Sequence, residues 1–133
     1  MSENKKEKTA FVKVNPNDVS VYTPAGHGDT YNRRLVGPDM GSKYVEVILG
    51  EMGPKGTADS HVHNSVEQII YLLEGSLKVI SLGAEETLEP GDLGFIPVGV
   101  SHQVICDTGR ARFLVIYAPP KEKLQIRDLI NSR

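Results

Sequence analysis

Two of the four histidines are spaced so that both side chains can bind one metal ion. His61 and His63 form an H-x-H pair, whereas His27 and His102 each stand alone. Side chains at positions i and i+2 of a strand lie on the same face, about 7 Å apart. Two imidazoles placed in this way can reach one metal ion. The alternative is that both are ordinary core or surface histidines, and the pair alone leaves that alternative open.

Short apolar runs predict strands on both sides of this pair. They are rich in Val, Ile, Leu, Phe and Tyr, and they cover residues 43–49, 67–74, 77–82, 93–97, 102–106 and 112–117. Turn-forming residues separate them, including Gly50, Gly53, Pro54, Gly56 and Gly75. Many short strands with frequent turns favour an all-β sandwich or barrel. Residues 121–130 instead have the apolar spacing of a short C-terminal helix.

Two segments resemble the motifs of the cupin superfamily. In the first, the H-x-H pair is followed by a ligand position and then, after six further residues, by Gly75. In the second, the family's spacing is met by Gly91, Pro97, Gly99 and His102. The resemblance implies a double-stranded β-helix, the cupin or jelly-roll barrel, forming a single domain over residues 10–133. It also implies that His102 joins the H-x-H pair as a metal ligand.

The resemblance leaves two residues open as the fourth ligand. Six residues separate Gln68 from Gly75, which puts Gln68 at the position where the family usually has an acid, and Glu67 has the shorter spacing from His63. Neighbouring side chains on a strand point to opposite faces, so only one of the two can face the metal. Gln68 is favoured, because cupins that act on unsaturated uronates share the H-x-H-x4-Q spacing.

This ligand set has chemical consequences. Three neutral imidazoles and one amide oxygen leave the charge of a divalent ion uncompensated, which favours an anionic small molecule in the open positions. A metal with open positions can polarise a carbonyl as a Lewis acid. The nitrogen-rich set suits one divalent transition metal, Zn, Ni, Fe, Mn or Co.

Several other side chains are candidates for a substrate pocket. Arg33 or Arg34 could bind a substrate carboxylate through its guanidinium fork, and the alternative is a surface ion pair. His27 lies in a glycine-rich segment and could act as an acid or base at the pocket mouth, or be an exposed loop residue. The remaining pocket candidates, all on predicted strands, are Ile70, Leu72, Val104 and Tyr117.

Composition narrows the class of protein. The formal net charge is -2, with 15 basic against 17 acidic residues, which argues against nucleic acid as a partner. No apolar run has the length of a membrane span, and one cysteine permits no disulfide within the chain. We therefore expect a cytoplasmic protein without a membrane partner. Residues 1–9 are polar and predict a disordered tail.

Two further expectations concern assembly and function. Residues 69–73 are apolar at every position, so both faces of that strand need cover, which predicts a homodimer. The favoured function is a metal-dependent enzyme for a small polar or carboxylate-bearing metabolite. Its chemistry would be isomerisation, cyclisation, decarboxylation or oxygenation. The alternative is a non-catalytic module that binds or senses a small molecule.

Overall fold

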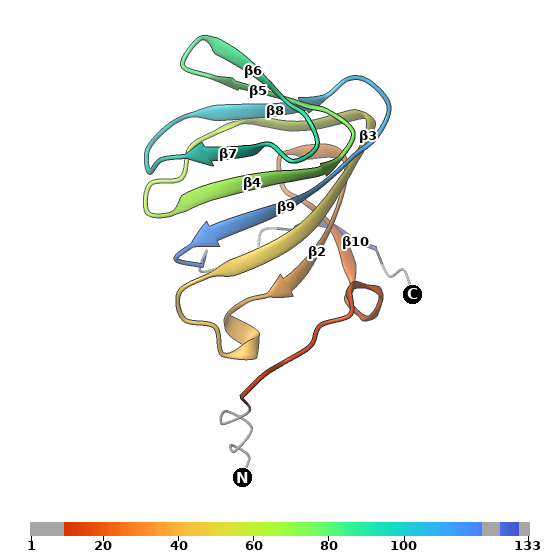
Figure 1. Cartoon of the computed structure of the whole chain (residues 1–133), viewed down its shortest axis with the longest axis vertical. Helices are drawn as coiled ribbons and strands as arrows, with labels where there is room; N and C mark the ends of the chain where they lie inside the picture. The colour runs from red at the N-terminus through yellow and green to blue at the C-terminus, as the bar shows by residue number, and fades with distance from the viewer. Residues whose placement is uncertain (1–9, 121–125, 131–133) are drawn as a thin grey trace.

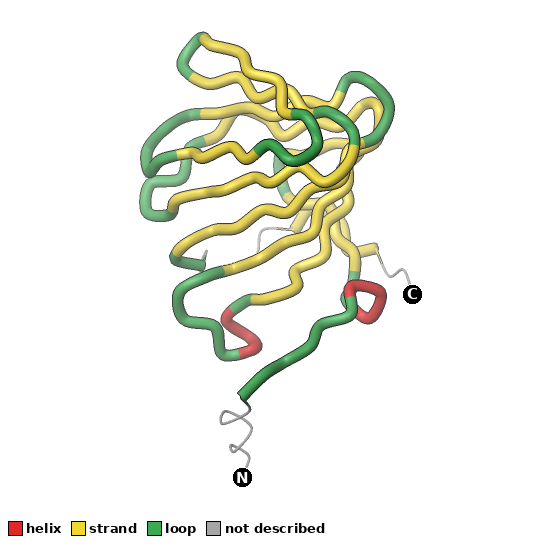
Figure 2. Tube along the Cα trace, in the orientation of Figure 1, coloured by secondary structure: helices red, strands yellow, loops and turns green. Residues whose placement is uncertain are grey.

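The computed structural model describes residues 10–120 and 126–130, and this part of the chain is built from strands (Figure 1). Its helical turns are two short 3-10 segments, η2 Pro16–Asp18 and η3 Pro38–Met40 (Figure 2). In chain order the strands are β1 Val21–Pro24, β2 His27–Val36, β3 Glu46–His61, β4 Glu67–Glu74, β5 Leu77–Ser81, β6 Ala84–Leu88, β7 Leu93–Ile96, β8 His102–Cys106, β9 Ala111–Ala118 and β10 Ile126–Ile130.

The strands form one antiparallel network in which β3 has the central place. The network has two arms that share β3. The first arm runs β10-β1-β2-β3-β8-β5-β6, and the second arm leaves β3 and continues through β9 and β4 to β7. Buried side chains from both arms gather in one core cluster. Figure 1 shows the two arms curving away from β3 around this shared interior. The expected all-β barrel is confirmed.

The strand β3 runs through residues that the sequence analysis placed in turns. Gly50 is needed there for close packing. A Cβ at this position would come within 2.5 Å of the Phe113 ring and 2.9 Å of Asn32 Oδ1. The prediction of a break at residues 50–56 was therefore wrong, because glycine also serves wherever side chains from neighbouring strands press against the backbone.

At its middle, β3 changes partners. Residues 46–52 pair with β9 and residues 56–61 pair with β8. Pro54 lies between these two ladders, so its missing N–H falls where no ladder bond is required. The adjacent Lys55 N–H donates to Asp29 Oδ2 at 3.0 Å, which ties the corner to β2. This change of partners lets one strand belong to both arms.

The interior follows the two-residue period of the strands. On β9 every second residue from Ala111 to Tyr117 is buried, and on β4 the buried residues are Gln68, Ile70 and Leu72. The opposite faces of β4 and β7 carry Tyr71, Leu93 and Phe95, all exposed. Alternating burial on β9 and β4 is the pattern of strands with one face toward a core.

The C-terminal helix predicted for residues 121–130 was wrong over residues 126–130, the part that the structure describes. Residues 126–130 form β10, which pairs antiparallel with β1, for example Tyr22 with Leu129. An available sheet edge satisfies the backbone of this segment, and that tertiary contact outweighs its helical spacing. Residues 121–125, like the predicted tail at residues 1–9, lie outside the described residues. The assignment of residues 10–133 to one domain stays a prediction.

Four strands were not predicted at all. These are β1, β2, β6 and β10, while the predicted runs are confirmed as the start of β3 and as β4, β5, β7, β8 and β9. Within residues 10–120 and 126–130, none of the helical segments has the length and apolar character required to cross a bilayer.

Candidate metal centre

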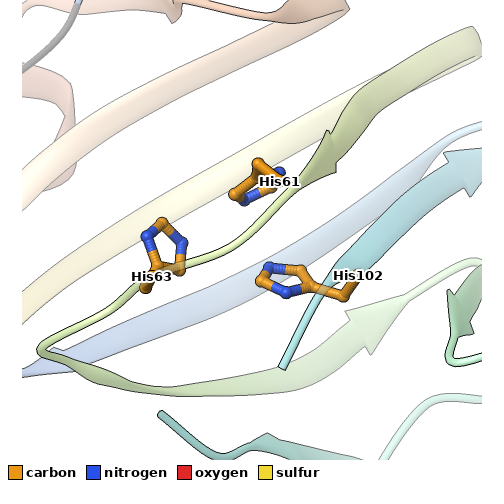
Figure 3. Close-up of side chains that lie close together, drawn as sticks. All are labelled: His61, His63 and His102. Atoms are coloured by element: carbon orange, nitrogen blue, oxygen red, sulfur yellow. The ribbon is translucent and has the colours of Figure 1, made fainter. Parts of the chain in front are cut away.

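Three histidines from two distant parts of the sequence lie close together (Figure 3). One nitrogen from each of His61, His63 and His102 lies within 4.8 Å of the corresponding nitrogens of the other two. The ring centroid of His61 is 4.8 Å from that of His63 and 4.3 Å from that of His102. Such spacing allows the three imidazoles to bind one ion together.

The strands and one loop contact bring these side chains together. His61, the last residue of β3, is the cross-strand partner of His102, the first residue of β8. His63 lies beyond the end of β3, in the connection to β4. Its carbonyl accepts the N–H of Gly99 at 2.8 Å. Gly99 has φ +81, a left-handed conformation that glycine adopts without a Cβ clash, so the second motif holds the first in place.

Backbone carbonyls orient two of the imidazole rings. His61 Nδ1 lies 2.6 Å from the carbonyl oxygen of Asp59, and His102 Nδ1 lies 3.0 Å from that of Val100. A carbonyl oxygen can only accept, so Nδ1 is the protonated nitrogen in both rings. The Nε2 lone pair of each ring is then available to a metal ion, the usual arrangement for metal-binding histidines.

The structure places the two candidate fourth ligands on opposite faces of β4. Gln68 is 5% exposed and its Oε1 is a buried oxygen without a hydrogen-bond partner. Glu67 is exposed to solvent. A buried amide oxygen without a partner is costly, and a bound cation would satisfy it. The face of the strand therefore favours Gln68 over Glu67.

These donors fit a divalent transition metal. Gln68 and His61 both line a small inner cavity of about 40 Å³, which is room for an ion or a water molecule. Three imidazole nitrogens and one amide oxygen form a mainly nitrogen donor set, which such metals accept. Among the described residues the histidine cluster is the group of side chains suited to hold a metal.

A larger cavity of about 740 Å³ opens beside the histidines. His27 lies on its wall, with its ring centroid 6.3 Å from that of His61, so it belongs to the site and not to an exposed loop. Tyr117 lines both cavities, and its ring lies 5.2 Å from His63. Burial raises the pKa of Tyr117 well above its usual value, so its hydroxyl stays protonated at neutral pH.

The other predicted pocket residues divide into two groups. Ile70 and Val104 line the small cavity next to Gln68. Leu72 is fully buried in the core and lines neither cavity. Leu72 therefore contributes to packing below the site, since β4 continues past the cavity floor.

The two arginines lie off both cavities. Arg34 is held by two carboxylates, Asp39 at 3.3 Å and the fully buried Glu46 at 3.7 Å. Arg33 is half-buried, and its neighbours' alternation on β2 puts it on the face opposite Asn32. Neither lines the cavities. Arg34 therefore takes part in ion pairs, which was the alternative to binding a substrate carboxylate.

Sequence reasoning did not single out Asn32. It is 7% exposed and lines both cavities from β2. The signal lay in alternation: had residues 27–36 been recognised as a strand, Thr30 and Asn32 would have shared one inward face. The polar sequence of this strand concealed that period, because its inner face carries Thr and Asn in place of apolar residues.

The fold and this cluster together define a β-barrel with a histidine cluster that could hold a metal ion. The sequence model of the Cupin domain family matches residues 48–117, which is more than half of the chain. The protein therefore belongs to this family. The match includes all three histidines and Gln68. The two motifs predicted this family and an all-β fold, and both predictions are confirmed.

Among similar proteins of known structure is the polyketide cyclase RemF from Streptomyces resistomycificus. It is 27% identical, with a TM-score of 0.76, and the match covers 88% of this chain and 85% of that one. A putative ethanolamine utilization protein EutQ from Salmonella typhimurium is 25% identical, with a TM-score of 0.61 and coverages of 69% and 71%.

A match of similar strength in sequence is Germin-like protein 1 from Brassica napus. It is 25% identical over 97 residues, which is 68% of this chain. The chain spans only 47% of the length of that relative. These relatives differ in what they are named for, so membership of the family establishes the fold but not the reaction.

Proposed function

We propose that this protein is a metal-dependent enzyme that converts a small carbonyl compound. One divalent transition metal ion would be held by His61, His63, Gln68 and His102. The observation that carries the proposal is the meeting of three histidine nitrogens within 4.8 Å of one another, beside the buried amide oxygen of Gln68. When bound, the metal supplies Lewis acidity toward a carbonyl oxygen.

The chain's own residues would bind and orient the substrate around that centre. The Asp59 and Val100 carbonyls hold two imidazoles in the tautomer that presents Nε2. Tyr117 is buried against His63 and keeps a protonated hydroxyl, which is able to donate a hydrogen bond to a substrate oxygen. His27 stands at the cavity wall near His61, where it can exchange a proton with a substrate.

Of the reaction classes considered, cyclisation has the most support. RemF, named a polyketide cyclase, matches this chain over 88% of its length. A polyketide carries several carbonyl groups, and ring closure requires one of them to lose an α-proton and another to accept the new bond. Because four neutral protein donors leave the ion's charge uncompensated, the site favours a ligand that is anionic where it meets the metal.

Metal analysis of the purified protein and three variants tests the ligand set. We expect the metal content to fall sharply in His61→Ala, His63→Ala and His102→Ala, because each removes one of three protein nitrogens. His27→Ala is the matched control and should retain the metal, since His27 lies outside the cluster. Unchanged metal content in all three ligand variants would show that the proposed centre is wrong.

Turnover separates an enzyme from a binding module. The metal-loaded protein is incubated with small keto acids, uronates and polycarbonyl compounds, and products are followed by mass spectrometry. We expect conversion that a chelator abolishes and that added metal restores. Binding of these compounds without conversion would favour the non-catalytic alternative.

A further inference from the structure

The larger cavity extends beyond the histidines to a second polar group made by Tyr22 and Asn32. Both line the same 740 Å³ cavity as His61 and His63. A cavity of this volume suits a ligand of drug size, so it is larger than a simple keto acid requires.

The described lining of this cavity contains no lysine or arginine. Its one acidic residue is Asp59. The guanidinium of Arg34 is already shared between Asp39 and Glu46. A ligand carboxylate placed beside Tyr22 and Asn32 would therefore lose water without gaining a cation, which is unfavourable.

Asn32 offers a hydrogen-bond acceptor. Its amide group hydrogen-bonds to the Tyr22 hydroxyl. Its Oδ1 is a buried oxygen without a partner. The absence of a side chain at Gly50 leaves room for this oxygen, because a Cβ there would lie 2.9 Å from it. A ligand hydroxyl would satisfy this acceptor, whereas a carboxylate has no proton to give.

Tyr22 adds no charge to this part of the cavity. Burial, followed by the negative charge of Glu46, raises the pKa of Tyr22 to about 12. Its phenol is therefore neutral at physiological pH. Glu46 itself is fully buried nearby, and a second carboxylate would add like charge beside it.

We propose that the cavity takes an uncharged, hydroxyl-bearing carbonyl compound, with its carbonyl end at the histidines and its hydroxyl donated to Asn32. This inference rests on the proposed function, because it takes the metal centre as the site of the carbonyl end. It sharpens the expectation of an anionic ligand. Negative charge is accommodated where the ligand meets the metal and is disfavoured at the Asn32 end.

Three matched ligands test the proposal by calorimetric titration of the metal-loaded protein. They are para-hydroxybenzoylacetone, benzoylacetone and para-carboxybenzoylacetone, which share one dicarbonyl end and differ at the other. We expect the hydroxyl compound to bind about tenfold tighter than either of the others. In Asn32→Leu the advantage of the hydroxyl should disappear, while metal content and thermal stability are checked in parallel. Tyr31→Phe, the exposed neighbour on β2, is the control and should keep the advantage.

Two outcomes would overturn this inference. One is equal or tighter binding of the carboxylate compound by the wild-type protein, a result that does not depend on any variant. The other is a hydroxyl advantage that survives in Asn32→Leu. The same titrations with metal-free protein keep the two proposals distinct. Affinities that do not change on metal removal would contradict the proposed function, whereas metal-dependent binding without hydroxyl preference contradicts only the substrate class.

Discussion

The strand β4 presents two unlike surfaces on its two faces. Inward, Gln68, Ile70 and Leu72 are 5%, 2% and 0% exposed. Outward, Tyr71 is 37% exposed, and its cross-strand neighbours on that face are the apolar residues Leu93 and Leu114. The inner face ends in a polar ligand position, while the outer face is apolar along most of its length. One strand thus faces the barrel interior on one side and carries an exposed apolar surface on the other.

This difference shows how the barrel separates its tasks. The inner face buries the side chain of Gln68, and at the histidine cluster His61 has His102 as its cross-strand partner. The outer face constrains its residues only within the sheet. Substitutions on the two faces of β4 should therefore affect different properties of the protein.

The largest effect is expected from Leu72→Ala. Leu72 is fully buried, and removing its side chain leaves a cavity that the surrounding barrel cannot fill. We expect the free energy of unfolding to fall by about 2–5 kcal/mol, measured by denaturant titration. Tyr71→Ala on the outer face of the same strand is the control. An equal loss in both variants would contradict the distinction between the two faces.

The outer face gives the predicted homodimer a specific surface. This surface consists of Ile69, Tyr71, Leu93, Phe95, Leu114 and Ile116, which lie in register on β4, β7 and β9. None of the six is charged, and a two-fold dimer needs one patch that can pack against its own copy. We propose a second copy of this chain as the occupant.

Phe95→Asp tests this dimer. Phe95 is 54% exposed, so the change should leave the fold intact, but it would bury an unpaired carboxylate at the interface. We expect the dimer dissociation constant to rise about a hundredfold, measured by sedimentation equilibrium, without loss of metal. Wild-type protein that is purely monomeric at micromolar concentration would refute the homodimer.

The metal end of β4 supplies a finer comparison between adjacent residues. Gln68→Ala removes the inward amide oxygen, and we expect metal affinity to fall about tenfold or more. Glu67→Ala removes an exposed carboxylate and should leave the affinity unchanged. The measurement is competition with a chelator of known affinity. A weaker metal site in Glu67→Ala, with none in Gln68→Ala, would reverse the choice of ligand.

The three histidines could be predicted because the patterns that identify them lie within short segments of the chain. The H-x-H pair and the second motif carry their spacing within short segments, so the three histidines and the strands β4 and β8 could be predicted together. The strand β2 could not, because its inner face is made of Thr30 and Asn32 and shows no apolar period. The passage of β3 through Gly50 depends on the Phe113 ring of β9, a contact far away in sequence.

The C-terminal segment shows the same limit. Its pairing with β1 is a long-range contact that local spacing does not contain. The ion pair between Arg34 and the fully buried Glu46 is likewise a contact that local spacing does not contain. Carboxylate binding by Arg33 or Arg34 stays a prediction, and in this structure neither of them lines the cavities.

The smallest effect is expected from an inner tyrosine at high pH. Burial raises the pKa of Tyr22 from 10.0 to about 12 in the folded protein. The native state therefore favours the protonated phenol. Its contribution to stability is complete below pH 10 and is lost as the pH rises toward 12. Tyr22→Phe should reduce the fall in unfolding free energy over this window, as measured by denaturant titrations at stepwise pH.

Tyr44→Phe provides the matched outer control for this measurement. Tyr44 is 76% exposed, so its side chain has similar surroundings in the folded and unfolded chain. Its variant should follow the wild-type pH profile. Tyr117, whose pKa burial also raises, remains in both variants and keeps part of the alkaline loss in each. An identical profile for Tyr22→Phe and the wild type would mean that the Tyr22 phenol is as well solvated inside the barrel as outside it. The cavity end beside Asn32 would then be open to water and able to accept a charged ligand.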